Sequence, residues 1–400
     1  MLEGLRVSAF LAGRSLRRGN KGTIVLTVMI IALVFVNLVF LPSIVQGVVV
    51  SFNRQAIDYN YGNLDIEPRE GEFYIPDGDT LVTRLGRMPG VVAAAPRIVV
   101  GAAITFATTT RSRSVIGVDR ETEVLVTRTS TRMIEGEYLS AGDRDAIVIG
   151  KTLAGEKDER LDQLESLGGA RVGDSVTVAY SNGEIRRYRV KGIFRTDAVG
   201  ADSSAYVTRA ELADVLGLQG QVSQVLIRTV EEGNEDEFRN RLYAFGVQEP
   251  ISTWQEKSRG ILADVTESFA IINLISTAVS LIIAVVVIFI VVFINTVNRR
   301  RQIGILKAIG IDKGMIVNSY VLQVIFMALL GTGLGVGLLA VVLRLLTVYP
   351  LRFPGGPVYP AVETAQILQS MASLLIVSVI AGYVPAWRTA SEEILSAIRG

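Results

Sequence analysis

The sequence predicts a membrane protein with four transmembrane α-helices and a large α+β extracytoplasmic domain between the first helix and the second. Two observations carry this prediction. Half of the 400 residues are hydrophobic while 20% are charged, a mixture typical of apolar spans joined to a polar domain. The chain also contains four long runs without any charged residue, and residues 54–267 separate the first run from the second.

Each charge-free run exceeds the roughly 20 residues with which a helix crosses a bilayer. The runs are Gly22–Asn53, Ser268–Asn298, Gly314–Leu343 and Thr364–Trp387. We expect the third helix to continue to residue 348. The first run is too long for the apolar core of a signal peptide, so we interpret it as a retained span.

The Lys and Arg residues predict the direction of the spans. They are concentrated before the first span, in the segment 299–313 and in the tail 388–400, whereas the loop 349–363 holds only Arg352. The positive-inside rule therefore places both termini and the segment 299–313 in the cytoplasm, and residues 54–267 outside. We therefore expect the protein to cross the cell (inner/cytoplasmic) membrane several times, as a multi-pass membrane protein.

The segments that flank the spans have patterns of their own. Residues 1–20 predict a cytoplasmic amphipathic helix, with a disordered basic tail as the alternative, because apolar residues recur there at helical spacing. The loop 349–363 contains four prolines and predicts an extracytoplasmic turn and not a helix.

Residues 54–267 predict an α+β domain of two subdomains, with a β-rich subdomain inserted near residues 100–200. The predicted strands are Asn63–Glu67, Val91–Val100, Val115–Val118, Ala146–Ile149, Ser175–Tyr180, Ile185–Ile193, Ser204–Val207, Val222–Arg228 and Gly246–Glu249. The predicted helices are Asp79–Met88, Lys151–Leu167, Arg209–Leu216 and Glu235–Phe245. Asn182 and Gly183 are typical of a hairpin turn, and Gly217 of a helix end.

The absence of His and Cys excludes thiol nucleophiles, histidine acid–base chemistry and Cys or His metal sites. We therefore expect no catalytic, cofactor-binding or metal site in this chain. The net charge of +1 gives no reason to expect a nucleic-acid partner.

Three patterns concern helices. The first pattern is an apolar stripe at the outer end of each of the first two spans, which predicts that these helices continue as stalks outside the bilayer. An ordinary linker is the alternative. The stripe residues are Val48, Phe52, Ala56, Ile261, Val265 and Phe269. The second pattern is a series of small residues in the third span, Gly331, Gly333, Gly335 and Gly337. Small residues four apart on a helix predict close packing against another helix. A phosphate-binding loop is disfavoured because no lysine follows the glycines. The spans contain no charged residue, which argues against an ion pathway through them.

The third pattern is the basic segment 299–313. Ile303, Leu306 and Ile309, with Ile305 and Ala308, predict one or two helical turns. Gly310 is placed to end this helix and Asp312 to cap the third span. Gly304 offers a position without a side chain, where another protein's backbone could approach. The alternative is a plain basic loop.

The stretch 301–310 resembles the signature of FtsX-like permeases, the membrane subunits of ABC transporters of the macrolide-exporter and lipoprotein-releasing (MacB/LolC-E) type. In this sequence it reads Arg301-Gln302-Ile303-Gly304-Ile305-Leu306-Lys307-Ala308-Ile309-Gly310. Residues 385–399 are similar to the closing pattern of the family, although Glu392-Glu393-Ile394 stands where that pattern has proline. Residues 135–139, 146–150 and 172–174 resemble its extracytoplasmic domain. The four-span layout resembles the family over the whole chain.

The resemblance implies a transmembrane permease subunit and a separate ATPase dimer that holds ATP and Mg²⁺, because the sequence has no phosphate-binding loop of its own. It implies that a coupling helix docks on that ATPase through Arg301, Gln302, Ile303, Gly304, Ile305, Leu306, Lys307, Ile309 and Gly310. It further implies a second permease chain, alike or merely similar, and movement of the extracytoplasmic domain that exports or extracts an amphiphile, a peptide or a lipoprotein.

Two other functions stay open from the sequence. The same fold could activate a cell-wall hydrolase mechanically without transport, although the large outer domain argues against that role. A membrane-anchored sensor or adhesion subunit is the alternative from another class. An adaptor, a hydrolase or a lipoprotein outside the cell is a further possible partner in each case, beside the lipid bilayer.

Overall fold

The computed structural model describes residues 8, 10, 12–14, 21–156, 165–298, 300–353 and 356–391. The chain divides into two compact units, and each is described here by itself. The first unit holds Met1–Val48, Val265–Leu351 and Val358–Gly400. The second holds Val49–Asp264 together with Arg352–Pro357.

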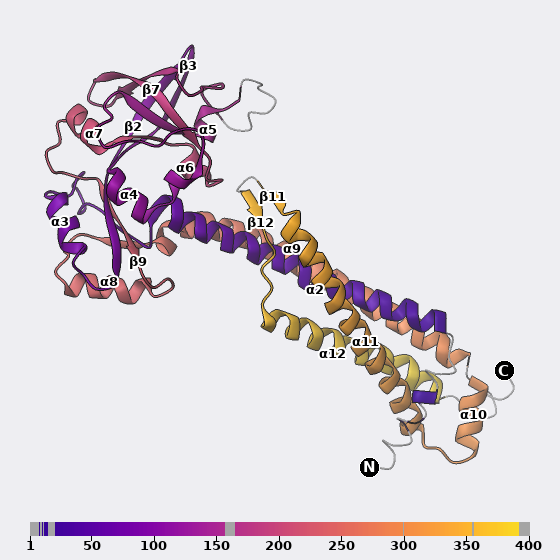
Figure 1. Ribbon diagram of the computed structural model, residues 1–400. Coiled ribbons are helices and arrows are strands. Elements are labelled where there is room, and N and C mark those ends of the chain that lie inside the picture. The colour runs from indigo at the N-terminus through magenta and orange to yellow at the C-terminus, as the bar shows by residue number, and fades with distance from the viewer. Residues whose placement is uncertain are drawn as a thin grey trace. The chain divides into compact units, whose positions relative to one another are not determined.

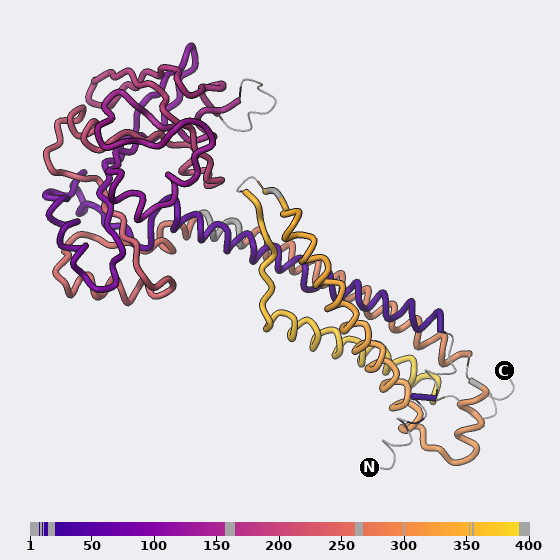
Figure 2. Tube along the Cα trace, in the orientation of Figure 1, coloured from indigo at the N-terminus to yellow at the C-terminus, as the bar shows by residue number. Residues whose placement is uncertain are grey.

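The first unit is built from long helices. They are α2 (Lys21–Gln55), α9 (Trp254–Val297), α10 (Arg300–Ala308), α11 (Lys313–Val348) and α12 (Thr364–Ser391). All except α10 contain a stretch long and apolar enough to cross a membrane, which agrees with the four predicted spans. The helices α11 and α12 pack against each other over part of their length, and their ends toward β11 and β12 lie apart (Figures 1 and 2).

The apolar side chains that the helices turn toward one another form one core. Phe35 of α2 and Leu374 of α12 are fully buried in it, and Ala284 of α9 and Val324 of α11 are nearly so. The inward faces of the spans contact one another, and their outward apolar faces stay exposed. This is the arrangement expected of a helix bundle in a bilayer, where lipid covers the outward faces.

Several boundaries differ from those predicted. The helix α9 begins at Trp254, where Thr253 and Glu256 cap it, upstream of the predicted span 268–298. The stalk prediction already placed helix before that span, although not as far back as Trp254. The loop 349–363 is not a plain turn but contains the paired strands β11 (Leu351–Phe353) and β12 (Gly356–Val358). Most of the predicted amphipathic helix 1–20 lies outside the described residues; residues 8, 10 and 12–14 are helical.

The second unit contains one large sheet. Its strands are β1 (Leu64–Ile66), β2 (Val91–Phe106), β3 (Thr109–Val118), β4 (Met133–Gly136), β5 (Ala146–Gly150), β6 (Ser175–Tyr180), β7 (Ile185–Phe194), β8 (Ala205–Thr208), β9 (Gln224–Thr229) and β10 (Ile251–Thr253). The order is β10-β1-β9-β2-β3-β8-β5-β7-β4, and β6 pairs with both β2 and β7. The extra pairing of β6 decides the architecture, because it closes β2, β3, β8, β5, β7 and β6 into a ring.

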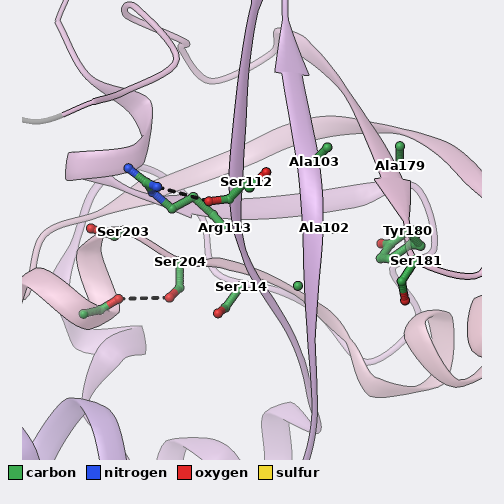
Figure 3. A pocket seen from close by; sticks show the side chains of 12 residues that line it. Ala102, Ala103, Ser112, Arg113, Ser114, Ala179, Tyr180, Ser181, Ser203 and Ser204 are labelled. Atoms are coloured by element: carbon green, nitrogen blue, oxygen red, sulfur yellow. Dashed lines mark hydrogen bonds between the residues drawn. The ribbon is translucent and has the colours of Figure 1, made fainter.

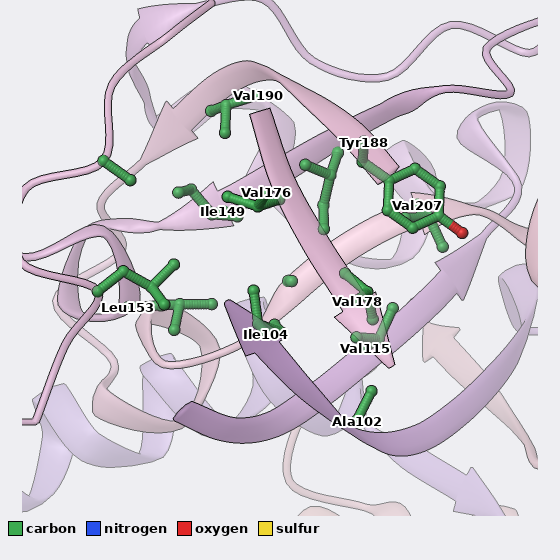
Figure 4. Packing of buried hydrophobic residues seen from close by; sticks show 14 of the residues in the cluster. Ala102, Ile104, Val115, Ile149, Leu153, Val176, Val178, Tyr188, Val190 and Val207 are labelled. Carbon is green, nitrogen blue, oxygen red and sulfur yellow. The ribbon is translucent and has the colours of Figure 1, made fainter. Parts of the chain in front are cut away.

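This ring is a small barrel, and alternation along its strands separates an inside from an outside. Ile104 of β2, Val115 of β3 and Ile149 of β5 are fully buried within it (Figure 4). The neighbouring residues Ile116 and Tyr206 point to the outer face and belong to another buried cluster. The barrel corresponds to the β-rich subdomain that the sequence predicts near residues 100–200.

The first half of β2 belongs to a second, open sheet. Residues 91–97 of β2 pair with β9, which pairs with β1, which pairs with β10. The helices α3 (Gly78–Leu85) and α8 (Glu235–Ala244) supply apolar side chains to the same buried cluster, in which Leu64, Leu85 and Leu242 are fully buried. The strand β2 therefore passes from one subdomain into the other.

Shorter helices connect these strands. They are the π-helix η1 (Ala56–Tyr61), α4 (Arg120–Val126), the 3₁₀ turn η2 (Thr129–Arg132), α5 (Lys151–Ala154), α6 (Val199–Asp202) and α7 (Arg209–Leu216). The prediction for α7 is confirmed at both ends: the Thr208 side chain accepts from the N–H of Glu211, and Gly217 takes the left-handed cap with a φ of +69°.

Two predicted elements are wrong. The helix at Lys151–Leu167 stops at Ala154 because Gly155, at a φ of +75°, breaks the first turn; residues 157–164 of that prediction lie outside the described residues. The strand at Gly246–Glu249 is a loop, and the edge strand β10 lies a few residues later, where Ile251 pairs with Ile66. Apolar alternation over so short a stretch does not fix the register of an edge strand.

Candidate functional site

The helix α10 ends at a sharply defined cap. Gly310 has a φ of +91°, a left-handed conformation that disfavours residues with a Cβ atom. Its N–H donates to the carbonyl of Lys307 at 3.0 Å, and the N–H of Ile311 donates to that of Leu306 at 3.1 Å. These two bonds make a Schellman motif, so Gly310 ends the helix as the sequence predicts.

The next helix begins two residues further on. The carboxylate of Asp312 accepts a hydrogen bond from the N–H of Gly314 at 2.8 Å, which caps α11 as predicted. The ammonium of Lys313 lies 4.8 Å from the ring centroid of Trp387 on α12, within cation–π distance. Caps on both sides of this short connection fix the path of the chain between α10 and the spans.

The helix α10 has one face turned to the bundle and one turned away. Ile303 is 4% exposed and belongs to the core of the spans, and Leu306 packs against the same core. On the other face Ile305 is 51% exposed and Ile309, just beyond the last turn, is 71% exposed. Two large apolar side chains at i and i+4 thus form an exposed apolar pair beside the basic residues of the helix.

This division changes the interpretation of the predicted docking residues. Gly304 is buried within the chain, so it does not offer the open backbone that the sequence analysis expected. Ile303 is likewise covered by the spans. The exposed residues of this segment are Arg301, Gln302, Ile305, Ala308, Ile309 and Gly310. Lys307 is half-buried between the two faces.

The four glycines of α11 also fall on two faces. A Cβ atom at Gly331 would lie 2.5 Å from Cγ2 of Ile31, and one at Gly335 would lie 2.7 Å from Cδ1 of Phe35. At Gly333 and Gly337 a Cβ atom would meet nothing within 4 Å in the described part of the chain. The close approach of α11 to α2 thus rests on Gly331 and Gly335, and a packing role for the other two stays a prediction.

The predicted stalk residues are placed in part. Val48 is buried in the first unit. Ala56 packs with Ile57 and Trp254 in the second, and Phe52 lines a cavity there. Phe269 is half-buried. The side chains of Ile261 and Val265 lie outside the described residues.

A cavity of about 590 Å³ lies in the second unit where the barrel meets the open sheet. We call it the junction cavity. Its wall is contributed by the end of α2, by η1, by the outer faces of β2, β3 and β8, by β9, by α6 and by the start of α9. The lining residues are Phe52, Gln55, Ala56, Tyr59, Asn60, Tyr61, Arg97, Val99, Ser114, Ile116, Ala198, Val199, Gly200, Ala201, Ser204, Tyr206, Gln224 and Ser258.

The charged residue in this wall, Arg97, is neutralised by a carboxylate. Arg97 is 2% exposed, and its Nε and one terminal nitrogen donate to the two oxygens of Glu123 at 3.0 and 2.5 Å. The other terminal nitrogen donates to the carbonyl of Asn60 at 3.1 Å. Burial alone would lower the pKa of Arg97, but the carboxylate of Glu123 raises it above its usual value. The guanidinium therefore stays charged and paired.

The remaining polar groups of the junction cavity are neutral. Burial raises the pKa of Tyr206 to about 12, which keeps its phenol protonated at neutral pH. The hydroxyl of Ser258 is buried and has no hydrogen-bond partner within the described part of the chain. Asn60 and Gln224 add amides. The cavity therefore offers an apolar wall with a few uncharged donors and acceptors, the composition of a small-molecule site.

A second hollow shares part of its rim with the junction cavity but differs in character. It measures about 740 Å³ and is lined by small side chains such as Ala103, Ser112 and Ala179 (Figure 3). Ala103 pairs with both Ser112 and Ala179 across the strands, so these residues form a row on the outer face of the barrel.

Sequence reasoning missed the junction cavity. One signal was present: Arg97 is the lone charge in the apolar run Val91–Val100, and a buried charge requires a partner. Its partner, Glu123, lies on α4, a helix that the sequence analysis did not predict. The π-helix η1 could not have been found, because the pattern 56–61 fits an ordinary α-helical continuation equally well.

Comparison with known proteins gives matches over most of the chain. Residues 24–244 match a family model described as MacB-like periplasmic core domain, and residues 274–394 match one described as FtsX-like permease C-terminal. An uncharacterized ABC transporter permease of Methanocaldococcus jannaschii is 24% identical over 273 residues, which cover 66% of this chain and 65% of the relative. The alignment thus spans just under two thirds of the length of that relative.

Two solved structures are similar to about half of the chain. The periplasmic region of MacB from Actinobacillus actinomycetemcomitans aligns at 10% identity and a TM-score of 0.35, covering 50% of this chain and 91% of that one. The extracellular domain of the ABC-type transporter YknZ from Gram-positive bacteria aligns at 17% identity and a TM-score of 0.34, covering 48% and 97%.

Proposed function

Because the chain belongs to the family of ABC transporter permeases with a MacB-like periplasmic core domain and an FtsX-like C-terminal region, we propose that it couples ATP hydrolysis on a separate ATPase subunit to movement of its outer domain. The coupling serves export or extraction of an amphiphile, a peptide or a lipoprotein. In this proposal α10 faces the cytoplasm and docks on the ATPase, and two permease chains act together.

The observation that carries the proposal is the exposed apolar pair on α10. Ile305 and Ile309 are 51% and 71% exposed on a helix that is capped at Gly310 and held to the spans through Ile303. Exposed large apolar side chains beside Arg301 and Lys307 are typical of a protein interface. Because Ile303 and Leu306 belong to the core of the spans, a displacement of α10 would be transmitted directly to them.

The length and continuity of the spans support transmission to the outside. Helix α9 has 44 residues, which corresponds to about 66 Å at 1.5 Å per residue. A continuous helix resists compression because each turn is hydrogen-bonded to the next, so a push at one end moves the other end. The charge-free spans fit a substrate handled outside the membrane or in its outer leaflet.

The test replaces Ile305 and Ile309 by Asp in the permease, reconstituted with its ATPase. We expect permease-stimulated ATPase activity to fall at least about tenfold, because a charge at the centre of an apolar contact costs about 1.4 kcal/mol or more. Substitution of Leu306 is unsuitable, since its contact with the core of the spans would confound docking with folding.

Ile185→Asp is the matched control. Ile185 is 66% exposed on β7 of the outer domain, so the same change in chemistry is made at an equally exposed isoleucine. It should leave ATPase stimulation unchanged. Stimulation that survives in the Ile305→Asp, Ile309→Asp double variant, with both proteins folded, would falsify the coupling role of α10.

A further inference from the structure

We propose that the junction cavity binds the apolar chain of an amphiphile whose head group is uncharged and forms hydrogen bonds. This inference deepens the proposed function, because it names the chemical class of the molecule that the outer domain takes from the membrane. The direction of transport rests on the proposed function. Binding itself requires neither the ATPase nor nucleotide.

The wall of the cavity selects an apolar occupant. Tyr59, Ile116 and Ala201 belong to the buried cluster on the outer face of the barrel, and Val199 closes the cavity from α6 with 47% of its side chain exposed. A volume of about 590 Å³ falls within the range of roughly 300–1,000 Å³ common to small-molecule sites. Water in such a space finds few partners, so an apolar chain displaces it favourably.

The charges of the wall exclude a charged head group. Both oxygens of Glu123 accept from Arg97, and one of them also accepts from Thr127 at 2.5 Å. An anionic head group would have to compete with Glu123 for Arg97, and breaking such a buried pair is strongly destabilising. A cationic head group would find no carboxylate among the lining residues that the structure describes. Uncharged hydroxyl or amide groups meet no such cost.

A second observation points independently to a polar ligand group. The Ser258 side chain is 7% exposed, lines the cavity, and its hydroxyl has no partner within the described part of the chain. A buried hydroxyl without a partner destabilises the protein, and a bound hydrogen-bonding head group would relieve that cost. Asn60 and Gln224 lie in the same wall and can hold the remaining donors and acceptors.

The backbone of the wall is also unusual. Residues Ala56–Tyr61 form a π-helix, a rare form that is frequently found at functional sites. Tyr59 and Asn60, both in the cavity wall, belong to this turn. The turn directly follows α2 in the sequence.

The experiment uses the full chain in nanodiscs and monopalmitoylglycerol with a diazirine in its acyl chain. After illumination, labelled peptides are mapped by mass spectrometry. We expect label on peptides that contain η1, α6 and β8. Label confined to the four spans overturns the proposal.

Variants at the cavity separate binding from background labelling. Val199→Trp fills the cavity from its rim and should lower the label about tenfold, because the indole occupies the space of the chain. Ala179→Trp makes the same kind of change in the second hollow and should leave the label unchanged. Equal labelling of the two variants overturns the proposal.

Ser258→Ala and competition test the head group. Removal of the lone hydroxyl should lower the label about fivefold without lowering the melting temperature, in line with about 1 kcal/mol for a neutral hydrogen bond. Unlabelled monopalmitoylglycerol should compete better than palmitate or a palmityl trimethylammonium salt. Equal competition by the charged amphiphiles overturns the assignment of an uncharged head group. These readouts are independent of ATPase coupling, so a failure of the proposed docking helix leaves them interpretable.

Discussion

At the scale of single residues, burial changes the pKa of a charged side chain in the outer domain, Asp65. Asp65 on β1 is 1% exposed, and one of its oxygens has no hydrogen-bond partner within the described part of the chain. Lys257 of α9 lies 3.6 Å from the other oxygen and also pairs with Glu67. Burial raises the pKa of Asp65 to about 7, with Lys257 acting in the opposite direction. Arg97 and Glu67 are the other charges that act on it.

The raised pKa predicts a loss of stability as the pH rises. The unfolded chain releases the Asp65 proton near its usual pKa of about 4, whereas the folded protein holds it up to about 7. The folded state is therefore favoured most below about 4, loses stability between about 4 and 7, and loses no more above that range. We expect Asp65→Asn to raise the melting temperature of the full chain at pH 8 relative to wild type, and to have little effect at pH 4.

Asp236→Asn is the control for this prediction, because the Asp236 side chain is 80% exposed on α8. Its melting temperature should follow that of wild type at every pH. A difference between Asp65→Asn and wild type that does not grow from pH 4 to pH 8 contradicts the assignment.

At the scale of elements, α11 packs through some of its glycines and not through others. Gly331→Ala and Gly335→Ala should each lower the melting temperature, because the new Cβ atoms would lie 2.5 Å and 2.7 Å from side-chain atoms of Ile31 and Phe35. Gly333→Ala and Gly337→Ala are matched controls on the same helix with nothing within 4 Å, and should be neutral or stabilising, since Ala favours a helix over Gly by about 1 kcal/mol. Four equal effects would contradict this packing.

The same elements show what sequence could predict. The four spans followed from charge-free runs, and the caps at Gly310 and Asp312 from the residue types that such positions require. The closure of the barrel did not follow, because it depends on β6 pairing with both β2 and β7, contacts far apart in sequence. Nor did the division of α10 into two faces: Ile303 and Ile305 are chemically alike, and only packing against the spans distinguishes them.

At the scale of the whole molecule, the proposal connects two sites that lie on different units of the chain. In the proposal the apolar pair on α10, in the first unit, docks on the ATPase, and the junction cavity, in the second unit, binds an amphiphile. The helices α2 and α9 each contain residues of both units. In the proposal these two helices carry the displacement of α10, and both contribute residues to the wall of the cavity.

Site-specific crosslinking tests the central claim most directly. A photoreactive amino acid at position 309 in cells that express the chain should form a covalent adduct with a protein that carries a nucleotide-binding site, identified by mass spectrometry, because this position is exposed beside the predicted contact. The same amino acid at position 185, on the outer domain, should not form that adduct. An ATPase captured from position 309 alone is the result that the account predicts. Capture of no ATPase at position 309, or equal capture at position 185, would contradict it.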